Sequence, residues 1–331
     1  MILRLSAPLI FLGFLAILAT GIGSSWMPLD RVVAALFGQG TRTDEIIIWT
    51  LRMPRVLLAM LAGAALALAG LLLQHVVRNP IASPSVLGLV DGAAVGVVLF
   101  LMLFSNEANA LVVSVHWLPL AATLGALSFA ALVALVAARD LMQPARLILY
   151  GIAAAALAKA LVTVLIVLGP VYRAGQSLIW LAGSVHAAHW DDVAILTCVL
   201  VVLTPVLAAM ARPLDQLLLD DQSAGATGLA LNYTKVAVLG LSVILTAAAV
   251  SFAGGLAFVG LLAPHIARAL VGLRMGALLI VTPAVGAAIV LGADIFARTM
   301  AAPLELPTGA ITALVGAPYF FWLLIKEVRR D

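Results

Sequence analysis

Charged residues are scarce in this chain of 331 residues, because Asp, Glu, Lys and Arg together make up only 10% of it. Soluble domains carry about 25%. A surface in contact with water cannot be built from so few charges, and 64% of the residues are hydrophobic. The net charge of +3 comes from Lys and Arg residues that are scattered singly, so the sequence gives no support for nucleic-acid binding.

Motifs for catalysis and metal binding are also missing. The single cysteine, Cys198, lies in an apolar run, which excludes a disulfide framework and a thiolate metal site and predicts a packing role. No lysine stands in a phosphate-binding loop, so the chain is not expected to hydrolyse ATP by itself. The H-E-x-x-H and G-x-S-x-G motifs are absent as well. We therefore expect no enzyme activity, no catalytic residues, and no metal or cofactor bound by this chain.

Apolar stretches of about 20 residues, the length that crosses a bilayer as a helix, recur from end to end. They do not alternate as barrel strands would, so they predict an all-α polytopic membrane protein with about ten transmembrane helices. The first stretch follows Arg4 and reads as a retained span, with a cleaved signal peptide as the alternative. The predicted spans are Ala7–Met27, Val56–Val77, Val86–Ser105, His116–Ala138, Leu147–Pro170, Val193–Met210, Tyr233–Phe252, Phe258–Gly272, Ala277–Ala297 and Gly309–Lys326.

The distribution of positive charge predicts the orientation. Ten spans place both termini on one side, and the positive-inside rule makes that side cytoplasmic. Its loops and tails contain Arg4, Arg78, Arg139, Arg146, Arg212, Lys235, Arg268, Arg274, Lys326, Arg329 and Arg330. The opposite loops hold Arg31, Arg42, Arg52, Arg55, Arg173 and Arg298. We therefore predict a multi-pass protein of the cytoplasmic (inner) membrane, in contact with lipid, with both termini cytoplasmic.

Two connections between spans carry further signals. Residues 173–192 hold Trp180, Trp190, His186 and His189, which favours an interfacial segment on the outside at the level of the lipid headgroups. Residues 212–232 form the longest cytoplasmic connection, and their glycines predict short surface helices joined by a glycine turn.

Two groups of short motifs lie in order along nearly the whole chain. The first group is Leu51-Arg-Met-Pro-Arg-Val-Leu-Leu, Gly63-Ala-Ala-Leu-Ala-Leu-Ala-Gly, Gln74, Arg78-Asn-Pro-Ile-Ala-Ser-Pro and Leu87-Gly. The second is Phe258-Val-Gly-Leu-Leu-Ala-Pro-His-Ile-Ala-Arg, Ala293-Asp-Ile-Phe-Ala-Arg, Glu305-Leu-Pro-Thr-Gly and Gly316-Ala-Pro. Together these motifs resemble the permease subunits of iron-siderophore, haem and vitamin B12 ABC importers. The resemblance implies the type II ABC importer permease architecture, with residues 1–331 as one transmembrane domain.

The resemblance also implies partners and sites. Two permease subunits, identical or homologous, would enclose one pathway, and two ATPase subunits would bind ATP and Mg. An outside substrate-binding protein would dock by pairing its carboxylates with Arg52, Arg55 and Arg298. The alternative role for these arginines is contact with lipid headgroups. The loop 212–232 would couple to the ATPase, unless it is a solvated connector. Its candidate contacts are Asp220, Asp221, Gln222, Ser223, Gly225 and Gly228, although the acidic pair followed by Ser223 departs from the family pattern.

Polar residues within or beside the spans are candidates for the pathway. Lys159, in the fifth span, is expected to pair with an acidic ligand or with Asp91. The alternatives are that its side chain extends to the membrane surface or that it is buried as a neutral amine. Gln74 and Asn79 lie near a helix break that is expected to shape the cytoplasmic gate. His265 bonds either to backbone or to a ligand. Asp294 is expected to hold Arg298, four residues away on one helical face.

The sequence therefore predicts the permease subunit of an ATP-driven importer that moves a ferric siderophore. Haem and cobalamin are alternative cargoes in the same family. An ion-coupled secondary carrier that uses Lys159 and Asp91 as its coupling charges is the main alternative class, and a structural subunit of a larger membrane complex is another.

Overall fold

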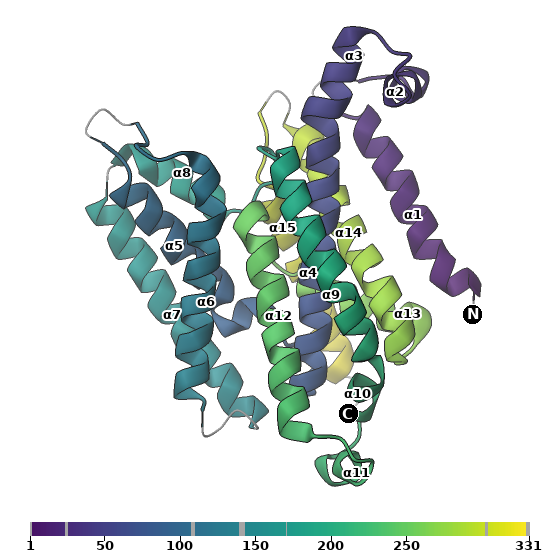
Figure 1. Ribbon diagram of the computed structural model, residues 1–331, viewed down its shortest axis with the longest axis vertical. Helices are drawn as coiled ribbons and strands as arrows, with labels where there is room; N and C mark the ends of the chain where they lie inside the picture. The colour runs from purple at the N-terminus through teal and green to yellow at the C-terminus, as the bar shows by residue number, and fades with distance from the viewer. Residues whose placement is uncertain are drawn as a thin grey trace.

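The computed structural model describes residues 2–23, 26–106, 110–138, 143–169, 171–301 and 304–328. Figure 1 shows the long helices in two groups side by side, one formed by α5 to α8 and the other by α1, α4, α9 and α12 to α15. The helices are α1 (Ile2–Gly21), α2 (Leu29–Leu36), α3 (Arg42–Ile46), α4 (Met53–Val77), α5 (Leu89–Leu103), α6 (Leu118–Val136), α7 (Pro144–Leu168), α8 (Val171–Leu181), α9 (Trp190–Ala209), α10 (Ala211–Gln216), α11 (Asp221–Ala226), α12 (Leu231–Ala253), α13 (Val259–Val271), α14 (Met275–Met300) and α15 (Thr308–Val328).

The two ends of the bundle differ in what they carry. The short helices α2 and α3 lie at one end, here called the α3 end, and α10 and α11 lie at the other, the α11 end (Figure 1). Helix α1 begins toward the α11 end, where α15 also ends. Arg139, Arg329 and Arg330, whose charges entered the predicted orientation, lie outside the described residues, as does Pro170 at the predicted end of the fifth span.

Helix α4 is the centre of the larger group and packs against α14, α12, α13 and α9. Small residues make this possible. A Cβ added at Gly63 would collide with the carbonyl of Gly286, and one added at Gly70 would collide with the carbonyl of Gly260. The glycines of this helix therefore permit close helix packing.

The predicted spans agree with the structure in number. In the described part of the chain, seven helices are long and apolar enough to cross a membrane, and three shorter apolar helices, α5, α13 and α15, account for the rest. The predicted third span began too early, because Pro84–Leu87 forms a 3₁₀ turn and Gly88 takes a left-handed conformation with φ 73°. The first span was placed several residues too late, since α1 already ends at Gly21.

One boundary was wrong in a way that changes the site. The second span was expected to begin at Val56, which put Arg52 and Arg55 in a loop, but the helix is continuous from Arg42 to Val77. Pro54 lacks an N–H and crowds the carbonyl four residues earlier. A π-helical turn over Ile47–Arg52 accommodates this defect, so the helix is not interrupted.

Residues 173–192 contain more helix than the sequence indicated. Most of α8 and the start of α9 fall in this range, and Trp190 donates from Nε1 to the carbonyl of Trp49 at 2.7 Å and stacks on its ring. The interfacial placement of this segment stays a prediction. Cys198, expected to be packed, is exposed on α9.

Candidate functional site

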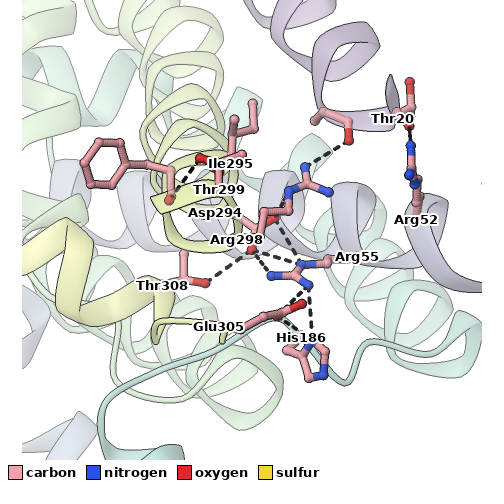
Figure 2. Close-up of polar contacts among 12 residues, drawn as sticks. Thr20, Arg52, Arg55, His186, Asp294, Ile295, Arg298, Thr299, Glu305 and Thr308 are labelled. Atoms are coloured by element: carbon pink, nitrogen blue, oxygen red, sulfur yellow. Dashed lines mark hydrogen bonds and ion pairs between the residues drawn. The ribbon is translucent and has the colours of Figure 1, made fainter. Parts of the chain in front are cut away.

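A buried cluster of charges lies at the α3 end, where α4, α14 and the segment before α15 meet (Figure 2). We call Arg52, Arg55, Arg298, Asp294 and Glu305 the arginine cluster. The three arginines are only 6%, 7% and 4% exposed, and Asp294 is fully buried. Burial of this many charges is tolerated only where each one is paired or hydrogen-bonded.

Arg55 and Asp294 form the central pair of the cluster. Arg55 donates from Nε at 3.0 Å and from Nη2 at 2.8 Å to Oδ1 of Asp294. Its remaining nitrogen, Nη1, donates to Oε2 of Glu305 at 2.9 Å and lies 3.1 Å from Nδ1 of His186. Oε2 of Glu305 lies 2.6 Å from Nδ1 of His186, and both side chains are partly exposed. They therefore form the accessible edge of an otherwise buried network.

The other two arginines are tied to the end of α1. Arg52 donates from Nη1 to the carbonyls of Thr20 at 2.7 Å and Gly21 at 2.9 Å. Arg298 donates from Nη2 to the carbonyl of Ala19 at 2.9 Å. The last carbonyls of a helix have no partner within it and carry its negative dipole end, so two cations here stabilise the end of α1.

These contacts change the interpretation of the predicted docking residues. The sequence assigned the three arginines to docking or to headgroups, and both roles stay predictions, but the side chains are buried and bonded within the chain. The predicted contact of Asp294 with Arg298 is present, at 3.6 Å between Oδ2 and Nε. The stronger bond from Arg55 to Asp294 was missed, because 239 residues separate the two and no local spacing reveals it.

At the α11 end, the predicted coupling loop is anchored to the long helices. Arg78 takes a left-handed conformation with φ 51° where α4 ends, and it donates to the carbonyls of Leu217 at 3.0 Å and Leu219 at 2.6 Å. It also pairs with Asp221 at 2.7 Å, and Lys235 at the start of α12 pairs with Asp221 at 3.1 Å. The hydrogen bond from Lys235 and then that from Arg78 lower the pKa of the Asp221 carboxyl.

The loop folds as two short helices, as predicted, but without a glycine turn between them. The link between α10 and α11 is Leu217–Asp220, and Gly228, with φ 85°, follows α11 instead. Asp220 caps α11 by accepting hydrogen bonds from the backbone N–H of Ser223 at 2.8 Å and from its hydroxyl at 2.7 Å. These bonds lower the pKa of Asp220.

Most of the charged and hydroxyl side chains predicted to contact an ATPase are therefore bonded within the chain. Asp220, Asp221 and Ser223 hold the loop together, whereas Gln222 is exposed and, in the described ranges, has no side-chain bond. The sequence missed Leu218, Leu219 and Tyr233, which are 45%, 44% and 78% exposed at this end. Exposed large apolar side chains beside polar ones are typical of interaction surfaces.

We expect Arg78→Ala to loosen the loop while the helical bundle stays folded. The variant removes three bonds that fix Leu217, Leu219 and Asp221, at a cost of about 1 kcal/mol for such exposed contacts. Hydrogen exchange of residues 217–226 should then accelerate roughly fivefold, whereas Arg42→Ala, at the other end, should leave it unchanged. Unaltered exchange in Arg78→Ala would show that this arginine does not anchor the loop.

The pH dependence of the same exchange has a definite sign. Since the folded pKa of Asp221 is lowered, its contribution to stability is present above the unfolded value of about 3.9 and is lost as the pH falls through the folded pKa. The loop in the parent protein should therefore loosen on acidification below pH 4, and Arg78→Ala should lose part of this response.

Three of the predicted pathway residues are structural contacts in this state. Gln74 is buried, donates to the carbonyl of Ala82 at 3.1 Å, and accepts from Nη2 of Arg268 at 2.6 Å. Asn79 accepts from the N–H of Ile81 at 3.0 Å and so fixes the turn after α4. The ring of His265 packs edge-on against Tyr319 of α15, with centroids 6.0 Å apart.

Lys159 and Asp91 lie near each other without forming the predicted ion pair. Their charges interact electrostatically across the contact of α5 with α7. Among the described residues, neither side chain forms an ion pair or a hydrogen bond. Lys159 is exposed, so its role in binding a ligand stays a prediction.

Within the part of the chain that the structure describes, ten apolar helices form the bundle of a polytopic membrane protein. A model of the FecCD transport family matches residues 9–326. The chain therefore belongs to the FecCD transport family, whose members are transport permeases and not enzymes.

Individual relatives agree with this assignment over nearly their full length. The chain is 43% identical over 321 residues to YfhA of Bacillus subtilis (strain 168), assigned as a siderophore transport system permease, covering 96% of this chain and 94% of that protein. It is 40% identical over 310 residues to the cobalamin import system permease BtuC of Halobacterium salinarum, covering 93% and 81%. A solved structure assigned to a metal-chelate type ABC transporter in an inward-facing conformation superposes with a TM-score of 0.85 at 30% identity, covering 97% and 98%. The predicted family and the predicted permease architecture are confirmed.

Proposed function

We propose that this chain is the permease subunit of an ATP-driven importer that carries a ferric siderophore across the cytoplasmic membrane, with both termini cytoplasmic. The family match and the siderophore assignment of the Bacillus relative support this cargo. The Halobacterium relative keeps cobalamin as an alternative, and haem remains the third. The chain would work with a second permease subunit, two ATPase subunits that bind ATP and Mg, and an outside binding protein.

The anchored loop is the observation that carries the ATP-driven mechanism. Arg78 joins the loop to α4, Lys235 joins it to α12, and Asp215 joins α10 to α14 by accepting from the N–H of Met275 at 2.8 Å. A push on α10 and α11 by an ATPase would therefore reach three long helices at once. The exposed Leu218, Leu219 and Gln222 offer the surface for that contact.

Docking of the binding protein follows from the edge of the arginine cluster. Nη1 of Arg55 faces two groups that are themselves accessible, Glu305 and His186. An incoming carboxylate would take the place of Glu305 on Arg55, while Asp294 keeps the other two nitrogens in position. Glu305 thus acts as an internal stand-in for the partner's carboxylate, and a hydrogen bond between a guanidinium nitrogen and a carboxylate is stronger than one between neutral groups.

We expect uptake of one labelled ligand, among ferric siderophores, haem and cobalamin, in cells that make this chain with its binding protein and ATPase. Leu218→Asp with Leu219→Asp should reduce that uptake at least tenfold, because the charges disrupt an apolar contact surface at the α11 end. Val112→Asp, which introduces a carboxylate at an exposed apolar position between α5 and α6, should leave uptake unchanged. Purified yield of each variant verifies folding.

The same assay separates the alternatives. Uptake that persists without the ATPase and collapses with the proton gradient would replace the proposal by an ion-coupled carrier. Glu305→Gln tests docking, since it leaves Nη1 of Arg55 without an anionic partner and should lower the binding-protein concentration for half-maximal uptake. A rise in that concentration would mean that Glu305 itself contacts the binding protein.

A further inference from the structure

A pocket of about 440 Å³ lies at the α11 end, between the end of α9, α10 and the start of α14. Arg212 from α10 and Arg274 just before α14 line it, together with Asp215, and small residues such as Ala208 and Gly276 form the rest of its wall. The pocket is separate from the arginine cluster at the opposite end of the bundle and from the surface formed by Leu218 and Leu219.

The two arginines of the pocket have no partner of their own among the residues that the structure describes. Both are exposed, and within the described ranges neither guanidinium forms a hydrogen bond or an ion pair. In contrast, Arg52, Arg55, Arg78 and Arg298 each donate a hydrogen bond of 2.9 Å or shorter. The one carboxylate in the pocket, Asp215, already accepts from the N–H of Met275. With both arginines counted, the pocket carries a net charge of +1 and suits an anion.

The helices that form the pocket continue as apolar surface toward the middle of the bundle. Val206 and Val202 are exposed on α9, one turn apart, and Ile280 is exposed on α14, one turn beyond Gly276. No side chain fills the space at Gly276, where an added Cβ would meet nothing within 4 Å. A ligand with an anionic head and apolar tails fits this arrangement of charge beside apolar surface.

We propose that this pocket binds the headgroup of an anionic phospholipid of the cytoplasmic leaflet, with its acyl chains lying along α9 and α14. Basic pockets between spanning helices on the cytoplasmic side bind anionic headgroups. The proposal rests on the proposed orientation, which makes the α11 end cytoplasmic. Because Arg212 is on α10 and Asp215 attaches α10 to α14, the bound lipid would brace the joint between the coupling loop and the spans.

The test is native mass spectrometry of the purified full-length chain, released from nanodiscs of phosphatidylcholine with increasing fractions of phosphatidylglycerol. We expect one phosphatidylglycerol to be retained in preference to phosphatidylcholine. Arg212→Gln with Arg274→Gln should lower the retained affinity roughly thirtyfold, from about 1 kcal/mol for each cation near an anionic surface. Gly276→Leu should also lower it, because the added side chain would enter the pocket, where a Cβ meets no atom within 4 Å, and the change removes no charge.

The control removes the same amount of charge elsewhere. Arg4→Gln with Arg42→Gln replaces two exposed arginines, one near each end, and should leave retention unchanged. Equal loss in this control, or full retention in both pocket variants, would overturn the site. Displacement of the lipid by inorganic phosphate at comparable concentration would show a site for free phosphate instead. Since neither ATPase nor uptake enters the measurement, its failure leaves the proposed transport function standing.

Discussion

Asp294→Asn should lower the free energy of unfolding by about 3–5 kcal/mol, the cost of removing one partner from a buried ion pair. Asp294 is fully buried and accepts from Arg55, lies 3.6 Å from Nε of Arg298, and lies 3.4 Å from the hydroxyl of Thr308. Asparagine keeps the shape but removes the charge, so two buried guanidinium groups lose their shared counter-ion. Thermal unfolding in detergent measures the effect.

The matched control for this variant is Asp30→Asn. Asp30 is exposed in α2 at the same end of the bundle, and among the described residues it has no ion pair. Its replacement should change stability by less than about 0.5 kcal/mol, as is usual for surface positions. If Asp294→Asn were no more destabilising than Asp30→Asn, the cluster would not be held together by this carboxylate.

Gly70→Val should destabilise the protein by about 3 kcal/mol or more, the upper part of the range for overpacking. A Cβ at this position would collide with the backbone carbonyl of Gly260, and backbone cannot move aside as a flexible side chain can. Helices α4 and α13 would have to separate, although α4 is the helix around which the larger group packs. The measurement is the yield of monodisperse protein and its thermal unfolding midpoint.

Gly13→Val provides the comparison for the same substitution in a spanning helix. A Cβ at Gly13 of α1 meets nothing within 4 Å, so this variant should unfold close to the parent temperature. A parent-like midpoint for Gly70→Val would mean that the contact of α4 with α13 is not as close as the structure has it.

The arginine cluster and the coupling loop show where prediction from sequence stopped. Arg52, Arg55 and Arg298 were found from the family resemblance of their motifs, and a docking role would explain why they break the positive-inside trend. The burial of all three and the bonds of Arg52 and Arg298 to α1 were not foreseen. The second span was expected to begin at Val56, whereas a π-helical turn continues the helix through Arg52 and Arg55. In the loop, acidic residues were assigned to a partner, although Arg78 and Lys235 bind Asp221 within the chain.

The sequence by itself determined the class of fold, the number of spans and the family. The length of an apolar stretch decides whether it can cross a bilayer, and a motif is a property of neighbouring residues, so neither depends on contacts between distant parts of the chain. It also determined the pair of Asp294 with Arg298, because four residues make one turn of a helix. Only the tertiary structure decided that Arg55 joins this pair, that two arginines stabilise the end of α1, and that Arg212 and Arg274 share a pocket. These contacts join residues far apart in the chain, and their geometry depends on how closely the helices pack, which glycines such as Gly63 and Gly70 set in three dimensions.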